Sequence, residues 1–209
     1  MSTKQESPRL AAVLLAAGPS SRLGEPKQMI RVGEECLVRR SARLLVALDP
    51  ESTTVVTGCG AEEIEVEVQD LPLRTVFNRD WAQGMGGSIA CGAQNTPRDV
   101  DGILIMACDQ WRLNLNDLER LVTAWIADIS RICLAAWKEG RAFVSGPPVI
   151  FPGSLIHELK FIAKDRGARQ VIDRHMELVE FVKVKNAAFD LDRPEDLEQL
   201  RQEQIAEPQ

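Results

Sequence analysis

Short apolar runs alternate with longer amphipathic stretches over about the first 130 residues of the chain. The continuous apolar runs at 10–16 and 102–107 are typical of strands that are covered on both faces of a sheet. A β-branched run at 53–57 and a shorter run at 73–77 predict two further strands. The N-terminal part of the chain should therefore form the buried strands of a sheet.

Helical periodicity fills the segments between these strands. The apolar residues of 37–48 fall on one face of a helix, which Asp49-Pro50 ends. The segment 61–68 fits a helix, although its alternation of Ile and Val with Glu also fits a strand. A weaker helix is expected at 88–94.

A capping-box pattern marks the start of a longer helix. Asn116 is followed three residues later by Glu119, and an apolar stripe then continues at helical spacing. The buried positions expected on this helix are Leu118, Leu121, Val122, Trp125, Ile126 and Ile129.

The C-terminal part of the chain is expected to add three strands and three helices. Gly146-Pro147-Pro148 should interrupt the second of these strands, because proline cannot donate to a strand ladder. The expected strands are 132–137, 143–151 and 178–184, and the expected helices are 155–163, 168–176 and 194–205.

The order of these elements predicts the fold class. Strands that alternate with helices favour a three-layer α/β/α, doubly wound domain of the Rossmann-like kind, with a mostly parallel sheet. No repeat or linker divides the chain, so a single domain over 10–205 is expected after a flexible N-terminal tail at 1–9. Ligands bind such sheets at the carboxyl ends of the strands, and the loops after strands are therefore the candidate sites.

Composition and charge exclude several classes of function. The net charge of -6 and the pI of about 5.1 argue against a nucleic-acid or membrane surface, because both need a positively charged face. The five cysteines include no CxxC pair and only two histidines are present, which disfavours a zinc site. Free thiols, no export signal and no apolar run of about 20 residues indicate the cytoplasm.

The loop after the first apolar run has the parts of an anion-binding site. Gly18 and Gly24 let backbone N–H groups approach a ligand, while Arg22 and Lys27 supply positive charge. It is neither a Walker A loop, since Glu25 follows Gly24, nor a GxGxxG loop. These residue types alone fit a solvated turn equally well.

The whole pattern L-A-A-G-x-S-x-R-x-G-x-P-K from Leu15 to Lys27 resembles the signature loop of sugar- and cofactor-nucleotidyltransferases. It is most similar to the molybdenum cofactor cytidylyltransferase branch, because the guanylyltransferase branch typically carries L-A-G-G. Leu23 stands where that family usually has Met. The resemblance implies that Leu15, Ala16, Ala17 and Gly18 border the base and phosphates, and that Arg22 and Lys27 neutralise the triphosphate.

Two further segments extend the resemblance toward a nucleotide and its metal. Asp109, in MACDQW, matches the family's Mg²⁺-binding Asp, with Gln110 beside it on the nucleotide and Trp111 in place of the usual Pro. The segment 78–92 is similar to N-x-x-W-x-x-G-M-x-x-S-x-x-x-G, which implies nucleotide contacts at Gly84 and Ser88. Ser88 fits a structural helix N-cap equally well.

The tryptophans of the chain other than Trp111 have a simpler interpretation. Trp81, Trp125 and Trp137 are expected to lie in the core rather than to stack on a ligand.

The C-terminal segments resemble the acceptor side of the same family. Residues 146–151 resemble G-x-P-V-x-F beside the acceptor pocket, and 164–169 resemble G-D-x-G-A-R, with Arg166 and Arg169 placed for phosphate. Residues 190–196 resemble D-x-D-T-P-E-D.

That last segment has two interpretations. Asp192, or Asp190, would be a second metal carboxylate, but Asp192 with Glu195 and Pro194 also fits a helix cap. The matched segments follow one another in the family order from residue 14 to residue 196.

The resemblance implies a Mg²⁺-dependent transfer of a nucleoside monophosphate, from CTP rather than GTP, to a phosphate-bearing acceptor with release of pyrophosphate. It further implies molybdenum-bound molybdopterin as the acceptor and a molybdenum enzyme as the recipient of the product. Two alternatives stay open at this point. One is the same chemistry with GTP or a sugar-phosphate acceptor, and the other is a nucleotide-binding maturation factor that catalyses nothing.

Overall fold

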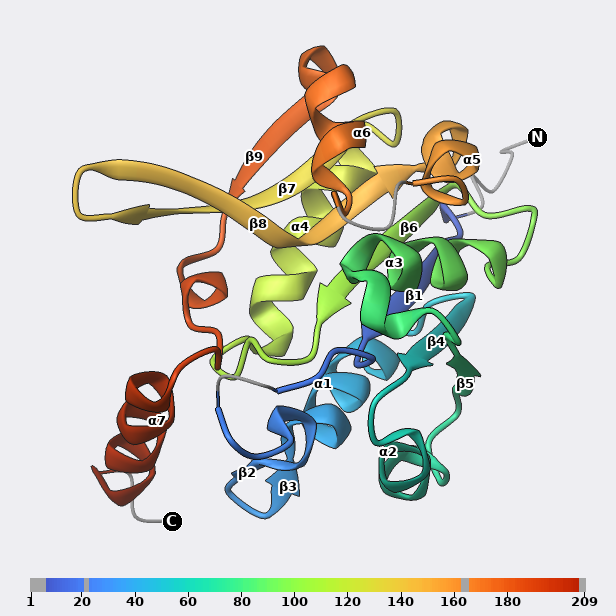
Figure 1. Cartoon of the computed structure of the whole chain (residues 1–209). Helices are drawn as coiled ribbons and strands as arrows, with labels where there is room; N and C mark the ends of the chain where they lie inside the picture. Colours follow the sequence, from blue (N-terminus) through green and yellow to red (C-terminus); the bar gives the residue numbers. More distant parts are fainter. Residues whose placement is uncertain (1–6, 21–22, 163–165, 207–209) are drawn as a thin grey trace.

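A seven-stranded sheet forms the centre of the protein (Figure 1), whose computed structural model describes residues 7–20, 23–162 and 166–206. The strand order is β5-β4-β1-β6-β8-β7-β9. Strand β8 is antiparallel to both β6 and β7, while all other neighbouring strands are parallel. The strands are β1 (Leu10–Leu15), β4 (Ser52–Thr57), β5 (Arg74–Phe77), β6 (Gly102–Ala107), β7 (Ile132–Glu139), β8 (Ala142–Pro152) and β9 (Val179–Lys183).

Helices cover both faces of this sheet (Figure 1). One buried cluster joins the sheet to α1, α2 and α4, and a second joins the opposite face to α3, α5 and α6. The helices are α1 (Leu37–Val46), α2 (Ala61–Val68), α3 (Met85–Gln94), α4 (Leu115–Ala127), α5 (Ile156–Leu159), α6 (Arg169–Arg174) and α7 (Pro194–Ala206). The predicted three-layer, mostly parallel fold is thus confirmed.

The first strand shows why its sequence is continuously apolar. Leu10, Ala12 and Leu14 face the cluster that includes α1, whereas the alternate residues Ala11 and Val13 face the cluster that includes α3. All six residues of β1 are buried, because successive side chains of a strand point to opposite faces and both faces are covered.

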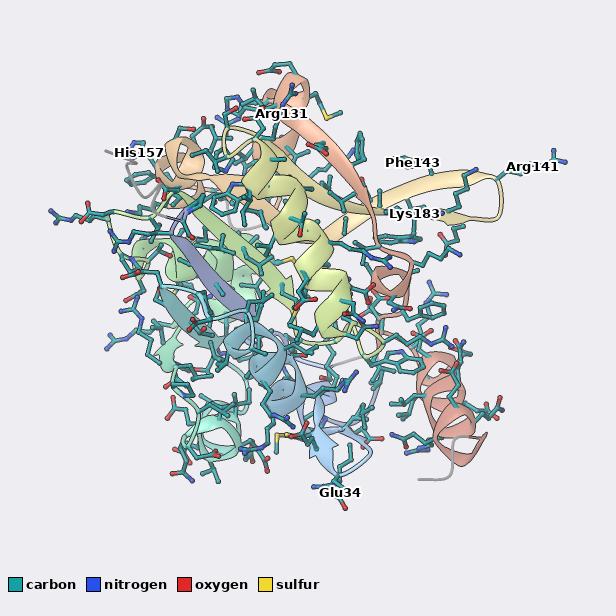
Figure 2. All side chains as sticks on the ribbon, turned by 180° about the vertical axis from the view of Figure 1, so that it is seen from behind. Glu34, Arg131, Arg141, Phe143, His157 and Lys183 are labelled. Atoms are coloured by element: carbon teal, nitrogen blue, oxygen red, sulfur yellow. The ribbon has the colours of Figure 1, made fainter. Side chains whose placement is uncertain are left out.

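The longest hairpin extends beyond the covered part of the sheet. Strands β7 and β8 continue past the helices, with Arg141 at the turn between them, and Figure 2 shows this turn projecting from the body. Phe143 is 61% exposed there and packs edge-to-face against Phe181 at 5.1 Å between ring centroids. In the part of the chain that the structure describes, no helix is long and apolar enough to span a bilayer.

The start of α4 differs from the sequence expectation. Its capping box is formed by Asn114 and Asp117, whose side chains accept each other's backbone N–H at 3.1 and 3.2 Å, rather than by Asn116 and Glu119. The buried stripe runs along Leu118, Leu121 and Trp125.

The same helix exposes two residues that were expected in that stripe. Ile126 is 51% exposed, because it lies one residue beyond Trp125 and is rotated away from the buried face. Ile129 is 40% exposed, because the helix ends at Ala127.

Other boundaries also differ. Strand β8 runs unbroken through Gly146-Pro147-Pro148, and the irregularity is taken up by a register shift opposite Leu134 and Ala135. Residues 61–68 are a helix, which settles the ambiguity between helix and strand. The helices expected at 155–163 and 168–176 are shorter, as α5 and α6. A small hairpin of β2 (Arg31–Val32) and β3 (Glu35–Cys36) had no counterpart in the sequence pattern.

Candidate active site

The carboxyl ends of β1 and β6 meet at the point where the strand order reverses direction. Cys108, directly after β6, donates its backbone N–H to the carbonyl of Leu15 at 3.2 Å, so the loops after the two strands lie side by side. A cavity of about 250 Å³ opens there. It is lined by Leu15, Ala16, Ala17, Gly18, Pro19, Lys27, Gln28, Trp81, Ala82, Gly84, Met85, Ser88, Ala107, Cys108 and Asp109. Most of the site residues expected from the sequence therefore share one pocket.

A lysine between two carboxylates forms the charged end of this pocket. Lys27 Nζ donates to Asp109 Oδ2 at 2.5 Å and to Asp192 Oδ1 at 3.1 Å. The side chains of Lys27 and Asp109 are 16% and 15% exposed, so this ion pair is largely shielded from water. Asp109 lies 82 positions and Asp192 lies 165 positions after Lys27 in the sequence, yet both carboxylates contact the same Nζ atom.

Electrostatics keep Lys27 charged. Desolvation by burial would lower the pKa of its ammonium group, but the charge and hydrogen bond of Asp109, together with Asp192, raise the pKa above its ordinary value of 10.5. A raised pKa means that this ion pair contributes fully to stability below pH 10.5 and is lost only as the pH rises through the higher folded-state value. Lys27 is therefore a fixed cation at neutral pH.

Gln28 shapes the loop that carries Lys27. Its Nε2 donates to the backbone carbonyls of Ala16 at 3.1 Å and Gly18 at 2.7 Å, and its side chain is buried. Ser20 Oγ accepts the backbone N–H of Lys27 at 2.6 Å. The loop thus folds back on itself and presents Lys27 to Asp109. Gln28 was not a candidate from the sequence, because a buried amide inside an irregular loop leaves no periodic signal.

The start of α7 differs from the cap pattern of Asp192 with Glu195 that the sequence offered. The carboxylate of Asp196 accepts the backbone N–H groups of Asp192 at 3.1 Å and Arg193 at 2.8 Å, so Asp196 rather than Glu195 supports the start of α7. Leu191 donates its N–H to the carbonyl of Asp109 at 3.1 Å. These bonds fix the 190–192 segment against β6 and direct the Asp192 carboxylate to Lys27.

The carboxylates of this site fit a divalent cation whose other ligands are phosphate oxygens. Mg²⁺ is commonly bound by one or two carboxylates plus substrate phosphates, and Asp109 and Asp192 supply such a pair. Desolvation and the negative charges of Asp109 and Asp192 raise the pKa of Asp190, which marks a local excess of negative potential. No group of three His, Cys, Asp or Glu side chains gathers around a possible metal position in the described ranges. A metal ion held by Asp109 and Asp192 would need further oxygen ligands, such as those of a phosphate.

The remaining expected residues divide between the pocket and the scaffold. Ser88 lies inside α3, which begins three residues earlier than expected, so Ser88 is not the N-cap of this helix. Its Oγ accepts a hydrogen bond from Asn78 Nδ2 at 3.1 Å at the wall of the pocket. Gln110 is turned away from the lining, because its Nε2 bridges the carbonyls of Pro147 at 2.6 Å and Ala187 at 3.0 Å. Arg22 lies outside the described residues.

Trp81 packs against the core, as the sequence predicted, and also lines the pocket. Gly58, directly after β4, makes this possible, since a Cβ there would lie 2.6 Å from Trp81 Cβ and 2.7 Å from the Ala17 carbonyl oxygen. That carbonyl is fixed by the N–H of Cys59 at 3.1 Å. The absence of a side chain at Gly58 therefore brings the indole directly against the loop after β1.

Substitution of Gly58 by alanine should displace Trp81 and deform the pocket. We expect the free energy of unfolding to fall by about 1–3 kcal/mol, as for other overpacked sites, and nucleotide binding to weaken by roughly tenfold. Denaturant melts and calorimetric titration with nucleotide measure the two effects. Gly18→Ala is the matched control for stability, because a Cβ at Gly18 meets nothing within 4 Å. Equal stability of the two variants would contradict this role of Gly58.

A second cavity of about 230 Å³ adjoins the first and shares Leu15 and Met85 with it. The predicted acceptor segments meet there, since Gly146 and Pro147 of β8 line it together with Arg166 and Arg169. Its interior is otherwise mostly apolar. Lys164 and Asp165 of the same predicted segment lie outside the described residues.

Comparisons with known proteins agree with this arrangement. The sequence profile of the MobA-like NTP transferase domain matches residues 12–179. Nicotine blue oxidoreductase of Paenarthrobacter nicotinovorans is 27% identical over 178 residues, which cover 84% of this chain and 87% of that protein. Purine catabolism protein PucB of Bacillus subtilis (strain 168) is 26% identical over 208 residues, covering 93% and 97%.

Among solved structures, Rv0371c from Mycobacterium tuberculosis H37Rv superposes with a TM-score of 0.80 at 21% identity, over 93% of this chain and 97% of that chain. A complex of Rv0371c with manganese superposes with a TM-score of 0.75 at 19% identity, over 92% and 97%. At these identities the similarity shows a shared fold.

Proposed function

The chain belongs to the MobA-like NTP transferase domain family, and on this premise we propose that it is a Mg²⁺-dependent nucleotidyltransferase. It would transfer a nucleoside monophosphate from CTP to a phosphate group of an acceptor and release pyrophosphate. The acceptor that the sequence favours is molybdenum-bound molybdopterin, with a molybdenum enzyme receiving the product.

The observation that carries this proposal is the contact of Lys27 with both Asp109 and Asp192 beside the loop at 16–18. A nucleoside triphosphate brings concentrated negative charge and metal-binding oxygens, and this site offers one fixed cation and two carboxylates at the switch point of the sheet. No side chain is needed as a covalent nucleophile, because positioning and charge neutralisation account for most of the catalysis of phosphoryl-type transfers.

Each residue then has a defined task in the transfer. An oxygen of the acceptor phosphate attacks the α-phosphorus, and the bond from that phosphorus to the bridging oxygen of the pyrophosphate breaks. Lys27 neutralises the charge that develops on the leaving pyrophosphate, and Gln28 keeps the loop at 16–18 in place. Asp109 and Asp192 would hold Mg²⁺, which supplies Lewis-acid stabilisation to the phosphate oxygens.

The choice of CTP rests on the loop after β1. Ala17 is buried and lines the pocket, at the position where the guanylyltransferase pattern has Gly. Its methyl group reduces the space available to the base, which favours the smaller cytosine over guanine. The cavity with Gly146, Pro147, Arg166 and Arg169 is the corresponding candidate for the acceptor, because two arginines at its edge suit a phosphate.

Three other functions make different predictions. A GTP-dependent or sugar-phosphate enzyme would share the chemistry but not the substrate. A maturation factor would bind nucleotide without releasing pyrophosphate. The name of one relative suggests an oxidoreductase, but hydride transfer has no need for two carboxylates around a lysine, whereas metal-assisted transfer does.

Pyrophosphate release is the test that separates these cases. With Mg²⁺ and molybdenum-bound molybdopterin, we expect release with CTP to exceed release with GTP, ATP or UTP by at least about tenfold, the scale of discrimination that pocket size alone provides. A coupled pyrophosphate assay measures each nucleotide, with a parallel assay of NADH and NADPH oxidation as a check on redox activity. Nucleotide binding without release of pyrophosphate from the nucleotide, whichever acceptor is supplied, would refute the transferase.

A further inference from the structure

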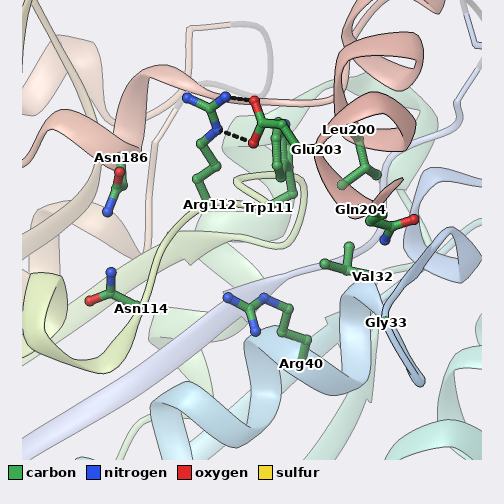
Figure 3. Close-up of a pocket in the computed structure, with 10 residues that line it drawn as sticks. All are labelled: Val32, Gly33, Arg40, Trp111, Arg112, Asn114, Asn186, Leu200, Glu203 and Gln204. Atoms are coloured by element: carbon green, nitrogen blue, oxygen red, sulfur yellow. Dashed lines mark hydrogen bonds and ion pairs between the residues drawn. The ribbon is translucent and has the colours of Figure 1, made fainter. Parts of the chain in front are cut away.

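The loop after β6 lines two cavities, of which the proposed transfer uses only one. Asp109 faces the cavity of about 250 Å³, whereas Trp111, Arg112 and Asn114 face a separate cavity of about 670 Å³ (Figure 3). Its walls come from the β2–β3 hairpin, α1, this loop, the turn before α7 and α7 itself. The lining residues are Val32, Gly33, Arg40, Trp111, Arg112, Asn114, Asn186, Leu200, Glu203 and Gln204.

This cavity is locally positive in a chain whose net charge is -6. It contains two guanidinium groups, of Arg40 and Arg112, and one carboxylate, of Glu203. Arg40 comes from α1 and donates from Nη2 to the carbonyl of Leu113 at 3.0 Å, a bond that uses one of its five N–H donors. Figure 3 shows Arg40 and Arg112 reaching the cavity from opposite walls.

Arg112 is held in a fixed orientation. Its Cζ lies 3.5 Å from the ring centroid of Phe189 and 4.8 Å from that of Trp111, and desolvation lowers its pKa from the ordinary value. A planar guanidinium fixed by aromatic rings is well suited to bind a carboxylate or phosphate through two parallel N–H groups. Glu203 now fills this place, with its Oε2 accepting from Arg112 Nε at 3.0 Å and its Oε1 close to Nη2.

From this arrangement we propose that the cavity binds a small phosphorylated metabolite, whose phosphate takes the place of the Glu203 carboxylate on Arg112. A phosphate monoester carries more charge than a carboxylate and has three oxygens, so it can compete for the guanidinium. The cavity volume lies within the range of small-molecule sites. The side-chain amides of Asn114, Asn186 and Gln204 bond to Asp117, Asp117 and Arg31, but an amide has two N–H donors and a carbonyl acceptor, so each keeps capacity for the hydroxyl groups of a sugar-like body.

Helix α7 connects this cavity to the candidate active site. Glu203 lies near the C-terminal end of α7, while Asp196 in its first turn bonds the backbone of Asp192. A phosphate on Arg112 would break the contact of Glu203 with the body of the protein, while Gln204 Nε2 still donates to the carbonyl of Arg31 at 3.1 Å and Leu200 stays buried.

Titration with ribose 5-phosphate, monitored by the indole N–H signals in NMR spectra, tests the proposal. We expect a saturable shift of the Trp111 signal, assigned with Trp111→Phe, and no shift with unphosphorylated ribose. Arg112→Gln and Arg40→Gln should each weaken binding by at least about tenfold, the usual cost of losing a charged hydrogen bond. Glu203→Gln should instead tighten binding, because it removes the internal competitor, a gain that structural damage would not produce.

The active site provides the control. Lys27→Met should leave the affinity for ribose 5-phosphate unchanged, because Lys27 lines the other cavity. This expectation is the same whether or not the protein is a nucleotidyltransferase. Absence of a saturable Trp111 shift would overturn the proposal. So would loss of binding in Lys27→Met with retention in Arg112→Gln, or identical affinity of the wild type and Glu203→Gln.

Discussion

Replacement of Asp109 by asparagine should lower pyrophosphate release by at least about 10³-fold, while the protein still folds. Asparagine keeps the size of the side chain and removes its charge, so one of the two carboxylates that could bind Mg²⁺ is lost. The same change leaves the shielded ammonium of Lys27 with the contact to Asp192. Loss of one side of such an ion pair should also cost about 1–3 kcal/mol of stability.

The neighbouring carboxylates provide matched controls. Asp192→Asn should be nearly as damaging as Asp109→Asn, because Asp192 also contacts Lys27, whereas Asp190→Asn should reduce turnover by less than about tenfold. Pyrophosphate release under saturating nucleotide gives the ranking, and circular dichroism verifies folding. Turnover of Asp109→Asn within tenfold of the wild type would reject a metal role for Asp109. Equal losses for Asp190→Asn and Asp192→Asn would reject the preference for Asp192.

The fold was predictable because its strands satisfy a simple physical condition. A strand covered by helices on both faces must be apolar at every position, and the sequences of β1 and β6 show this directly. Ligands bind such sheets at the carboxyl ends of the strands, and this rule made Asp109 after β6 and Gly18 after β1 candidate site residues. Both line the same pocket. Local sequence was sufficient for this much of the site.

The rest depended on contacts between distant residues. The local pattern at 192–195 fitted a helix cap with Glu195, but Asp196 accepts the backbone N–H groups at the start of α7 instead. The Asp192 carboxylate accepts a hydrogen bond from a lysine 165 positions away. Gln110 stands beside Asp109, yet it is committed to the carbonyls of Pro147 and Ala187. No periodicity or motif reports which of several polar neighbours a folded chain will pair.

Replacement of Lys27 by methionine should reduce pyrophosphate release by about 10²–10³-fold, because the leaving group loses its fixed cation. Methionine preserves much of the length and apolar contact of the lysine stem, so loss of charge is the main change. The raised pKa of Lys27 adds a second expectation, that wild-type activity shows no loss between pH 7 and 10 attributable to this group. Steady-state assays at several pH values measure both effects.

Lys27→Met should at the same time bind Mn²⁺ more tightly than the wild type when no nucleotide is present. In the wild type the ammonium contacts both carboxylates and competes with any metal for them, whereas in the variant Asp109 and Asp192 are left with excess negative charge. Electron paramagnetic resonance of free Mn²⁺ measures the affinity directly, and Lys27→Arg, which keeps the charge, is the control that should retain weak metal binding. A merely structural role for Lys27 predicts that activity and metal affinity fall together. A fall in activity together with a rise in Mn²⁺ affinity would instead show that lysine and metal compete for the same carboxylates. Binding of the metal–nucleotide complex would then free Lys27 to contact the triphosphate.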